Sequence, residues 1–180
     1  RGFGKAVSGG VGIGASVATA AIGGEIDAYI KDSDIGAGAV MVSASSDDKA
    51  TAEAEAASGG LGAALSGAAT IATIDPTVTA TVDNAILTAG NAVEVLATAK
   101  SEASTDSIGV AVAGGLAVGG SGADTTIATK AKASIINGSN ITAGSIKVAA
   151  LTSTPSAKAK SLGAAGALVG WAASPSGSAV

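Results

Sequence analysis

The stretch IGVAVAGGLAVGGSGADTTIATKAKASIINGSNITAGSIKVAA, residues 108–150, contains both sequence blocks that decide the fold of this chain. The later block, ASIINGSNITAG at 133–144, matches AYIKDSDIGAG at 28–38 and ATVDNAILTAG at 80–90, and it carries one extra residue. The three copies begin 52 and 53 residues apart. Recurrence at a nearly fixed spacing predicts a repeat architecture.

The other block is rich in glycine and occurs four times. AGGLAVGGSGA from Ala113 matches SGGVGIGAS from Ser8, SGGLGAALSGA from Ser58 and AAGALVGWAAS from Ala164, with starts 50, 55 and 51 residues apart. Since the two blocks alternate in fixed order, we divide the chain into a partial unit at 1–27 and units at 28–79, 80–132 and 133–180. We expect a single segment of a larger chain, because the N-terminal RGFGKAVSGG has neither an initiator Met nor a signal pattern.

Local patterns within the unit predict strands and turns. Small or apolar residues alternate with polar ones at 52–56 (AEAEA), 77–82 (TVTATV) and 128–135 (ATKAKASI), which is the period of a half-buried strand. Turns are indicated at Asp32-Ser33, Asp83-Asn84 and Asn137-Gly138, and at the glycines of the Ala-Gly pairs, which are Gly38, Gly90 and Gly144.

The composition limits how these strands can pack. Glycine and alanine supply 71 of 180 residues and aromatic residues only 2%, so large side chains cannot fill an ordinary globular core. A mainly helical fold is disfavoured because no stripe of large apolar residues recurs at helical spacing. We therefore predict an all-β fold, a parallel β-helix (β-solenoid) of about 52-residue units with two or three coils per unit. An antiparallel sandwich is the alternative, for which only Asn137-Gly138 provides a hairpin turn of the usual kind.

The order of the motifs in 108–150 resembles repeats of giant filamentous bacterial adhesins, the filamentous haemagglutinin and leukotoxin-like β-helical surface proteins. The resemblance rests on a small-residue block at Ser121–Ala123, a strand and turn at Ala133–Asn137, and a strand at Thr142–Ala149. It implies a right-handed parallel β-helix, secretion to the extracellular bacterial cell surface, and a structural or adhesive role as a rod-like stalk or a self-associating fibre. The first unit departs from the pattern at Lys31, Asp34 and Gly36.

Missing residue types exclude several kinds of chemistry. The chain has no His and no Cys, which excludes Ser-His-Asp and Cys-His catalysis and the usual zinc ligand sets. Arg1 is the only arginine and the net charge is −4, so we expect no nucleic-acid partner. We predict that the chain is not an enzyme and has no catalytic, cofactor-binding or metal-binding residues, no cofactor and no small-molecule substrate.

Three acidic pairs were weighed as sites against a simple solvent-exposed role. Asp32 with Asp34, and Asp47 with Asp48, offer oxygen ligands for Ca²⁺, but neither pair lies in a recognised calcium loop. Glu53 and Glu55 lie two apart, so they share one face of a strand as a general acid and base would. No His, Arg or aromatic residue accompanies them in the sequence, and solvent exposure is the preferred interpretation for all three pairs.

Four stretches without charge lie at 6–24, 56–74, 107–123 and 161–180. Their lengths approach those of membrane helices, which makes a membrane-inserting, pore-like or toxin-like segment the alternative function. Their many Gly and Ser residues favour an apolar face of the solenoid instead, so we do not expect a membrane partner. We expect self-association, lateral or end-to-end, and contact with other surface components, and we expect lysines at Leu116 and Val118 to abolish it.

Two further expectations concern single residue types. The aromatic residues Phe3, Tyr29 and Trp171 are too scattered to form a sugar-binding platform, and we expect each to fill a local gap or to cap an end. Ice binding would need matched threonines in successive units. Thr77, Thr79 and Thr81 form one such row, but Lys130, Lys132 and Ser134 take the equivalent positions in the next unit.

Overall fold

The computed structural model describes all 180 residues as strands and turns, without helices. Sheet A contains β1 (Gly2–Ser8), β4 (Val40–Gly60), β7 (Ala92–Ala113), β11 (Ser145–Thr152) and β12 (Ser156–Gly166). Sheet B contains β2 (Val11–Lys31), β5 (Ala63–Asp83), β8 (Leu116–Ile127), β9 (Lys130–Ile136), β13 (Val169–Ala173) and β14 (Ser176–Ala179). The short sheet C contains β3 (Asp34–Ala37), β6 (Ile86–Ala89) and β10 (Asn140–Thr142).

Every strand pairing is parallel, as predicted, and joins residues about one sequence repeat apart. Val11 pairs with Ala63 and Ala63 with Leu116 in sheet B, offsets of 52 and 53 residues. All-parallel pairing excludes the antiparallel sandwich and is compatible with a β-solenoid.

The expectation of two or three coils per unit is wrong. From β2 the chain passes through β3 in sheet C and β4 in sheet A, and then returns to sheet B as β5. Each repeat therefore visits each sheet once. The reason is that the long strands continue for 21 residues without a turn, where the prediction assumed shorter strands.

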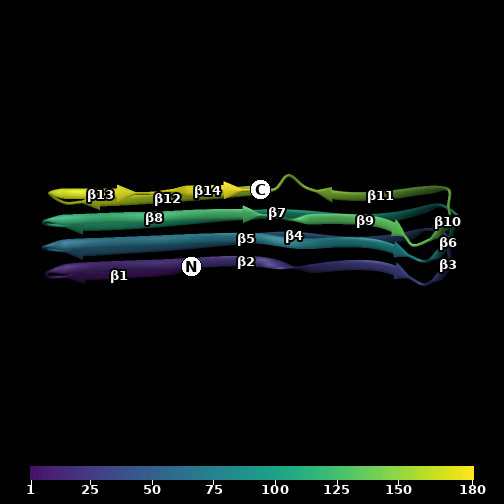
Figure 1. Ribbon diagram of the computed structural model, residues 1–180, viewed down its shortest axis with the longest axis horizontal. Helices are drawn as coiled ribbons and strands as arrows, with labels where there is room; N and C mark the ends of the chain where they lie inside the picture. Colours follow the sequence, from purple (N-terminus) through teal and green to yellow (C-terminus); the bar gives the residue numbers. More distant parts are fainter.

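The long strands set the shape of the molecule. They run side by side along its longest dimension, and the repeats stack across it (Figure 1). At about 3.3 Å per residue a 21-residue strand is roughly 70 Å long, whereas neighbouring repeats are only about 4.8 Å apart. The chain is thus a flat band of stacked strands rather than a narrow column.

Sheets A and B face each other, and the space between them narrows toward the end at which β2, β5 and β8 begin. Inward positions there are Gly, Ala and Ser, and a Cβ added to Gly14 would lie 2.5 Å from the carbonyl oxygen of Ala57 in the opposite sheet. A Cβ on Gly109 would overlap the carbonyl oxygen of Gly120 even more closely. The glycine-rich blocks are therefore needed here because the two backbones are in contact. We call this the thin half.

The half that ends in sheet C has a wider interior filled by branched side chains. Val78, Val82, Leu87, Val93 and Val95 are completely buried there, in one cluster of 13 buried residues. Ile74 and the nearly buried Ile127 stack in sheet B near the middle of the strands, next to the smaller side chains of the thin half. This thick half contains most of the large apolar side chains of the core.

The predicted turns between sheets B and C are confirmed. Asp32, Asn84 and Asn137 adopt φ angles of 48°, 48° and 54°, and Gly138 follows at 71°. The extra residue of the third copy is taken up here, since the offset changes from 53 at Ala133–Ala80 to 54 at Asn140–Ile86. The Ala-Gly pairs also lie at turns or bends, but only Gly24 and Gly138 among the glycines have positive φ angles.

Candidate association surface

The predicted acidic pairs do not form metal sites in the structure. Asp32 lies in the turn after β2, where its Oδ1 accepts a 2.7 Å hydrogen bond from the side-chain amide of Asn84. Asp34 begins β3 and is exposed. No group of three or more acidic side chains is arranged to hold a metal ion.

Asp47 and Asp48 face opposite sides of β4, so they do not act as a pair. Asp47 is exposed and lies 3.1 Å from Nζ of Lys100 in the next repeat. Asp48 is in the inward phase of the strand, and its Oδ2 is shielded without a hydrogen-bond partner. The alternation of a strand makes joint coordination of one cation by adjacent residues unfavourable.

Glu53 and Glu55 do share the outer face of sheet A, as predicted. Arg1 forms a 2.7 Å ion pair with Glu53, and Asp106 is the in-register neighbour of Glu53 in β7. Together with Phe3 these acids line a shallow pocket of about 140 Å³. Asp106 and Phe3 were missed from the sequence, because their proximity depends on pairing across 52 or 53 residues. Since Arg1 already occupies Glu53, the group is an ion-paired surface.

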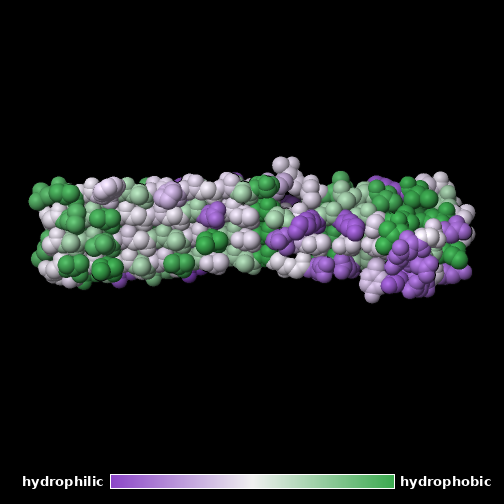
Figure 2. All heavy atoms as spheres, viewed as in Figure 1, coloured by the Kyte–Doolittle hydropathy of each residue, from purple (hydrophilic) through white to green (hydrophobic).

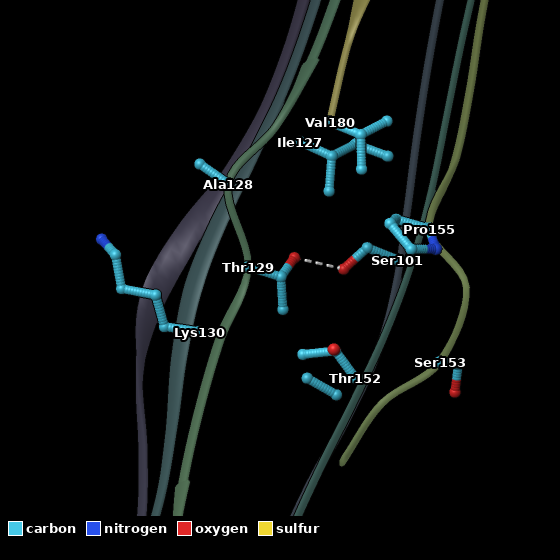
Figure 3. A pocket seen from close by; sticks show the side chains of 10 residues that line it. Ser101, Ile127, Ala128, Thr129, Lys130, Thr152, Ser153, Pro155 and Val180 are labelled. Carbon is cyan, nitrogen blue, oxygen red and sulfur yellow. Dashed lines mark hydrogen bonds between the residues drawn. The ribbon is translucent and has the colours of Figure 1, made fainter. Parts of the chain in front are cut away.

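An open cavity of about 340 Å³ lies between sheets A and B where both sheets are interrupted (Figure 3). The strands break at Ala128–Thr129 in sheet B and at Ser153–Pro155 in sheet A. Ser101 and Thr129 share a 2.6 Å hydroxyl hydrogen bond across it, while the Lys130 side chain points away. The cavity has polar walls but no charged group directed into it.

The most extensive unpartnered surface is the outer face of sheet B in the thin half. In-register pairing places side chains in rows that cross the strands. The ridge row consists of large residues, Ile13, Leu65, Val118 and Trp171. The groove row, two residues along each strand, consists of small residues, Ala15, Gly67, Gly120 and Ala173. On the far side of the ridge row lie Val11, Ala63, Leu116 and Val169.

These apolar side chains are exposed to solvent. The exposed fraction is 67% for Ile13 and 76% for Trp171, and Leu116 and Val118 are also largely accessible. Hydrophobic residues gather at the end where β2, β5, β8 and β13 begin, whereas hydrophilic residues are concentrated in the other half (Figure 2). An apolar face of this kind usually marks an interaction site.

The expectation that the aromatic residues fill local gaps is wrong. Phe3, Tyr29 and Trp171 are 69%, 71% and 76% exposed. They lie on β1, β2 and β13, each of which is an outermost strand of its sheet. The interior offers them no room because the paired backbones approach too closely in the thin half and valines already fill the thick half.

Charge is distributed unevenly along the stack of repeats. Residues 11–62 contain eight acids and two lysines, residues 63–115 five acids and one lysine, and residues 116–168 one acid and five lysines. Four ion pairs join successive repeats, and Arg1–Glu53 joins β1 to β4: Lys31–Asp83, Lys49–Glu102, Lys100–Asp47 and Lys130–Asp75 are the other four. Charge thus favours the observed register between neighbours.

Comparisons with protein-family models, with curated proteins and with solved structures found no match to this chain. The structure contains no helix long and apolar enough to cross a membrane. The chemistry of the surface itself, an apolar face on a stack of parallel strands, therefore provides the basis for a functional proposal.

Proposed function

We propose that this chain is a structural or adhesive segment of a secreted bacterial surface protein, in which a right-handed β-solenoid forms a stalk or a self-associating extracellular fibre. In this solenoid each repeat of 52 or 53 residues makes one turn. The right-handed sense is supported by the general preference of parallel crossover connections. The bacterial surface location follows only from the resemblance of the repeats to those of filamentous adhesins.

The observation that carries the proposal is the one-repeat register of the parallel ladders. In sheet B, β5 pairs with β2 along 21 residues on one side and with β8 and β9 on the other. Each repeat therefore provides a full-length template for the next, and stability grows by adding similar interfaces. Such a design suits a protein whose task is to extend over distance.

Charge supports end-to-end contact between stacks as well. Three columns across the sheets begin with an acid and end with a lysine: Glu25–Thr77–Lys130, Asp27–Thr79–Lys132 and Glu53–Asp106–Lys160. A second copy stacked in the same direction would place its acids beside these lysines. Complementary charges of this kind favour correct partners and register more than raw affinity.

Sedimentation velocity and cryo-electron microscopy of the purified chain, without detergent, test the proposal. We expect association that increases with concentration, and particles with a spacing of about 4.8 Å perpendicular to the strands. A fibre extended by stacking would be a band about 70 Å wide, because the strands lie across its axis. A chain that stays monomeric at all concentrations but inserts into lipid vesicles would overturn this proposal in favour of the membrane-inserting alternative.

A further inference from the structure

We propose that the outer face of sheet B in the thin half is a dry interface with a second copy of this chain. This inference rests on the proposed function, since it specifies one lateral contact through which the segment would associate. The two faces pack with the ridge row of each copy against the groove row of the other. A two-fold axis parallel to the stacking direction, between the two rows, relates the copies.

The relief of the face is complementary to itself. A row of Ile13, Leu65, Val118 and Trp171 projects beside a row in which the largest side chain is a methyl group. Cβ atoms added to Gly67 would meet nothing within 4 Å, so the groove row is open. Rotation about the proposed axis exchanges the two rows, as a two-fold symmetric contact requires.

The size of the face is sufficient for a stable contact between two copies. Eleven residues along four strands cover roughly 35 Å by 19 Å, or about 650 Å² on each copy. The two faces together bury about 1,300 Å², within the range of about 1,200–2,000 Å² for specific interfaces. Additional repeats of the same pattern would lengthen the ridge and groove rows and enlarge the interface in proportion.

The chemistry of the face favours a second copy over other partners. Within β2 and β5 it contains no charged side chain from Val11 to Gly23 or from Ala63 to Thr73, so it offers nothing to an ionic polymer. Trp171 is its only aromatic residue, whereas sugar-binding surfaces depend on aromatic stacking. A rigid, flat sheet face is matched best by another rigid, flat face with the same spacing of rows.

The outer face of sheet A at the same end is less suited to this contact. It contains Val112 and Leu162, but also Lys5 and the acids Glu53 and Glu55. Burying these charges against an apolar surface would be unfavourable. This face therefore provides matched control positions that have similar exposure and the same strand context.

Lysine substitution tests which face makes the contact. Ile13→Lys with Leu65→Lys should raise the dissociation constant of the dimer by about a hundredfold or more in sedimentation velocity, since each buried ammonium lacks a partner. Val112→Lys with Leu162→Lys on sheet A should leave it nearly unchanged. Circular dichroism of both variants checks that the strands are retained.

Cross-linking tests the alignment of the rows and does not depend on the loss of binding. The chain has no native cysteine, so single thiols report single positions. A mixture of Leu65→Cys and Gly67→Cys chains should be joined by a short thiol cross-linker more efficiently than either variant alone. A mixture of Leu65→Cys with Ala57→Cys, which lies on the outer face of sheet A, should not.

The outcomes separate this inference from the proposed function. If the wild-type chain associates but the sheet B lysines have no effect and the thiols on sheet A are joined instead, the interface is wrong and the fibre proposal stands. If the sheet B lysines abolish association but Leu65→Cys and Gly67→Cys are not joined preferentially, the row alignment is wrong. If the wild-type chain never associates, both proposals fail.

Discussion

The side-chain amide of Asn84 donates a 2.7 Å hydrogen bond to Oδ1 of Asp32, which occupies the same turn one repeat earlier. Both residues have φ angles of 48°, a conformation that Asn and Asp tolerate better than most side chains. Asn137 continues the column with φ of 54°, and its amide contacts Asp83. The turn between sheets B and C is therefore repeated in conformation and linked by side chains along the stack.

Asn84→Ala should destabilise the chain, because alanine loses the hydrogen bond and disfavours positive φ. We expect a loss of about 1–3 kcal/mol in the free energy of unfolding by denaturant. Asn84→Gly keeps the backbone freedom and should lose less. Asn91→Ala, at a turn without positive φ, is the control. Equal stability of the Ala and Gly variants would contradict the role given to the backbone angle.

Gly109→Ala should be destabilising because the new methyl group overlaps the carbonyl oxygen of Gly120 in the opposite sheet. Backbone atoms cannot move aside as a flexible side chain could, and overpacking of this kind costs about 1–3 kcal/mol. Gly122→Ala is the matched control, since its methyl group would meet nothing within 4 Å on the outer face. Thermal unfolding followed by circular dichroism measures the difference. Similar midpoints for the two variants would show that the sheets are not in contact.

Ser107→Ala should raise stability, in contrast to most core substitutions. The Ser107 hydroxyl is fully buried and has no hydrogen-bond partner, so removing it relieves an unfavourable burial of about 1 kcal/mol or more. Ser66→Ala is the comparison, because that hydroxyl donates a 2.8 Å hydrogen bond to the carbonyl of Ala56. We expect Ser66→Ala to lose about 1 kcal/mol by urea unfolding. The same sign for both changes would refute this account.

Lateral association through sheet B should persist at high salt. An apolar contact is not screened, and sulfate salts should strengthen it by favouring burial of apolar surface. Stacking that depends on the acid and lysine columns should weaken as the Debye length falls from about 10 Å at 0.1 M salt to about 3 Å at 1 M. Light scattering over a salt series measures both effects. Complete dissociation in sodium chloride would indicate that charge, and not the apolar face, holds the copies together.

Sequence reasoning recovered the features that depend on local pattern. Repeat spacing, the positions of the turns and the strands around Glu53 and Thr79 follow from short-range alternation and turn chemistry, and the structure confirms them. The candidate association surface was predicted in part, since Leu116 and Val118 were expected on an apolar outer face. Its row relief was not, because Ile13, Leu65, Val118 and Trp171 become neighbours only through pairing one repeat apart.

The direction of the side chains in the thin half is the clearest contribution of the tertiary structure. In VGIGASV at 11–17 a period-of-two pattern by itself would place Val11, Ile13 and Val17 inside, yet Gly12, Gly14 and Ser16 face inward. The opposite strand at Ala57 and Gly59 lies too close for any larger side chain. The sequence determined that these residues alternate between two faces. Only the close approach of sheet A to sheet B decided which face is the core, since backbone contact leaves room for glycine and excludes valine.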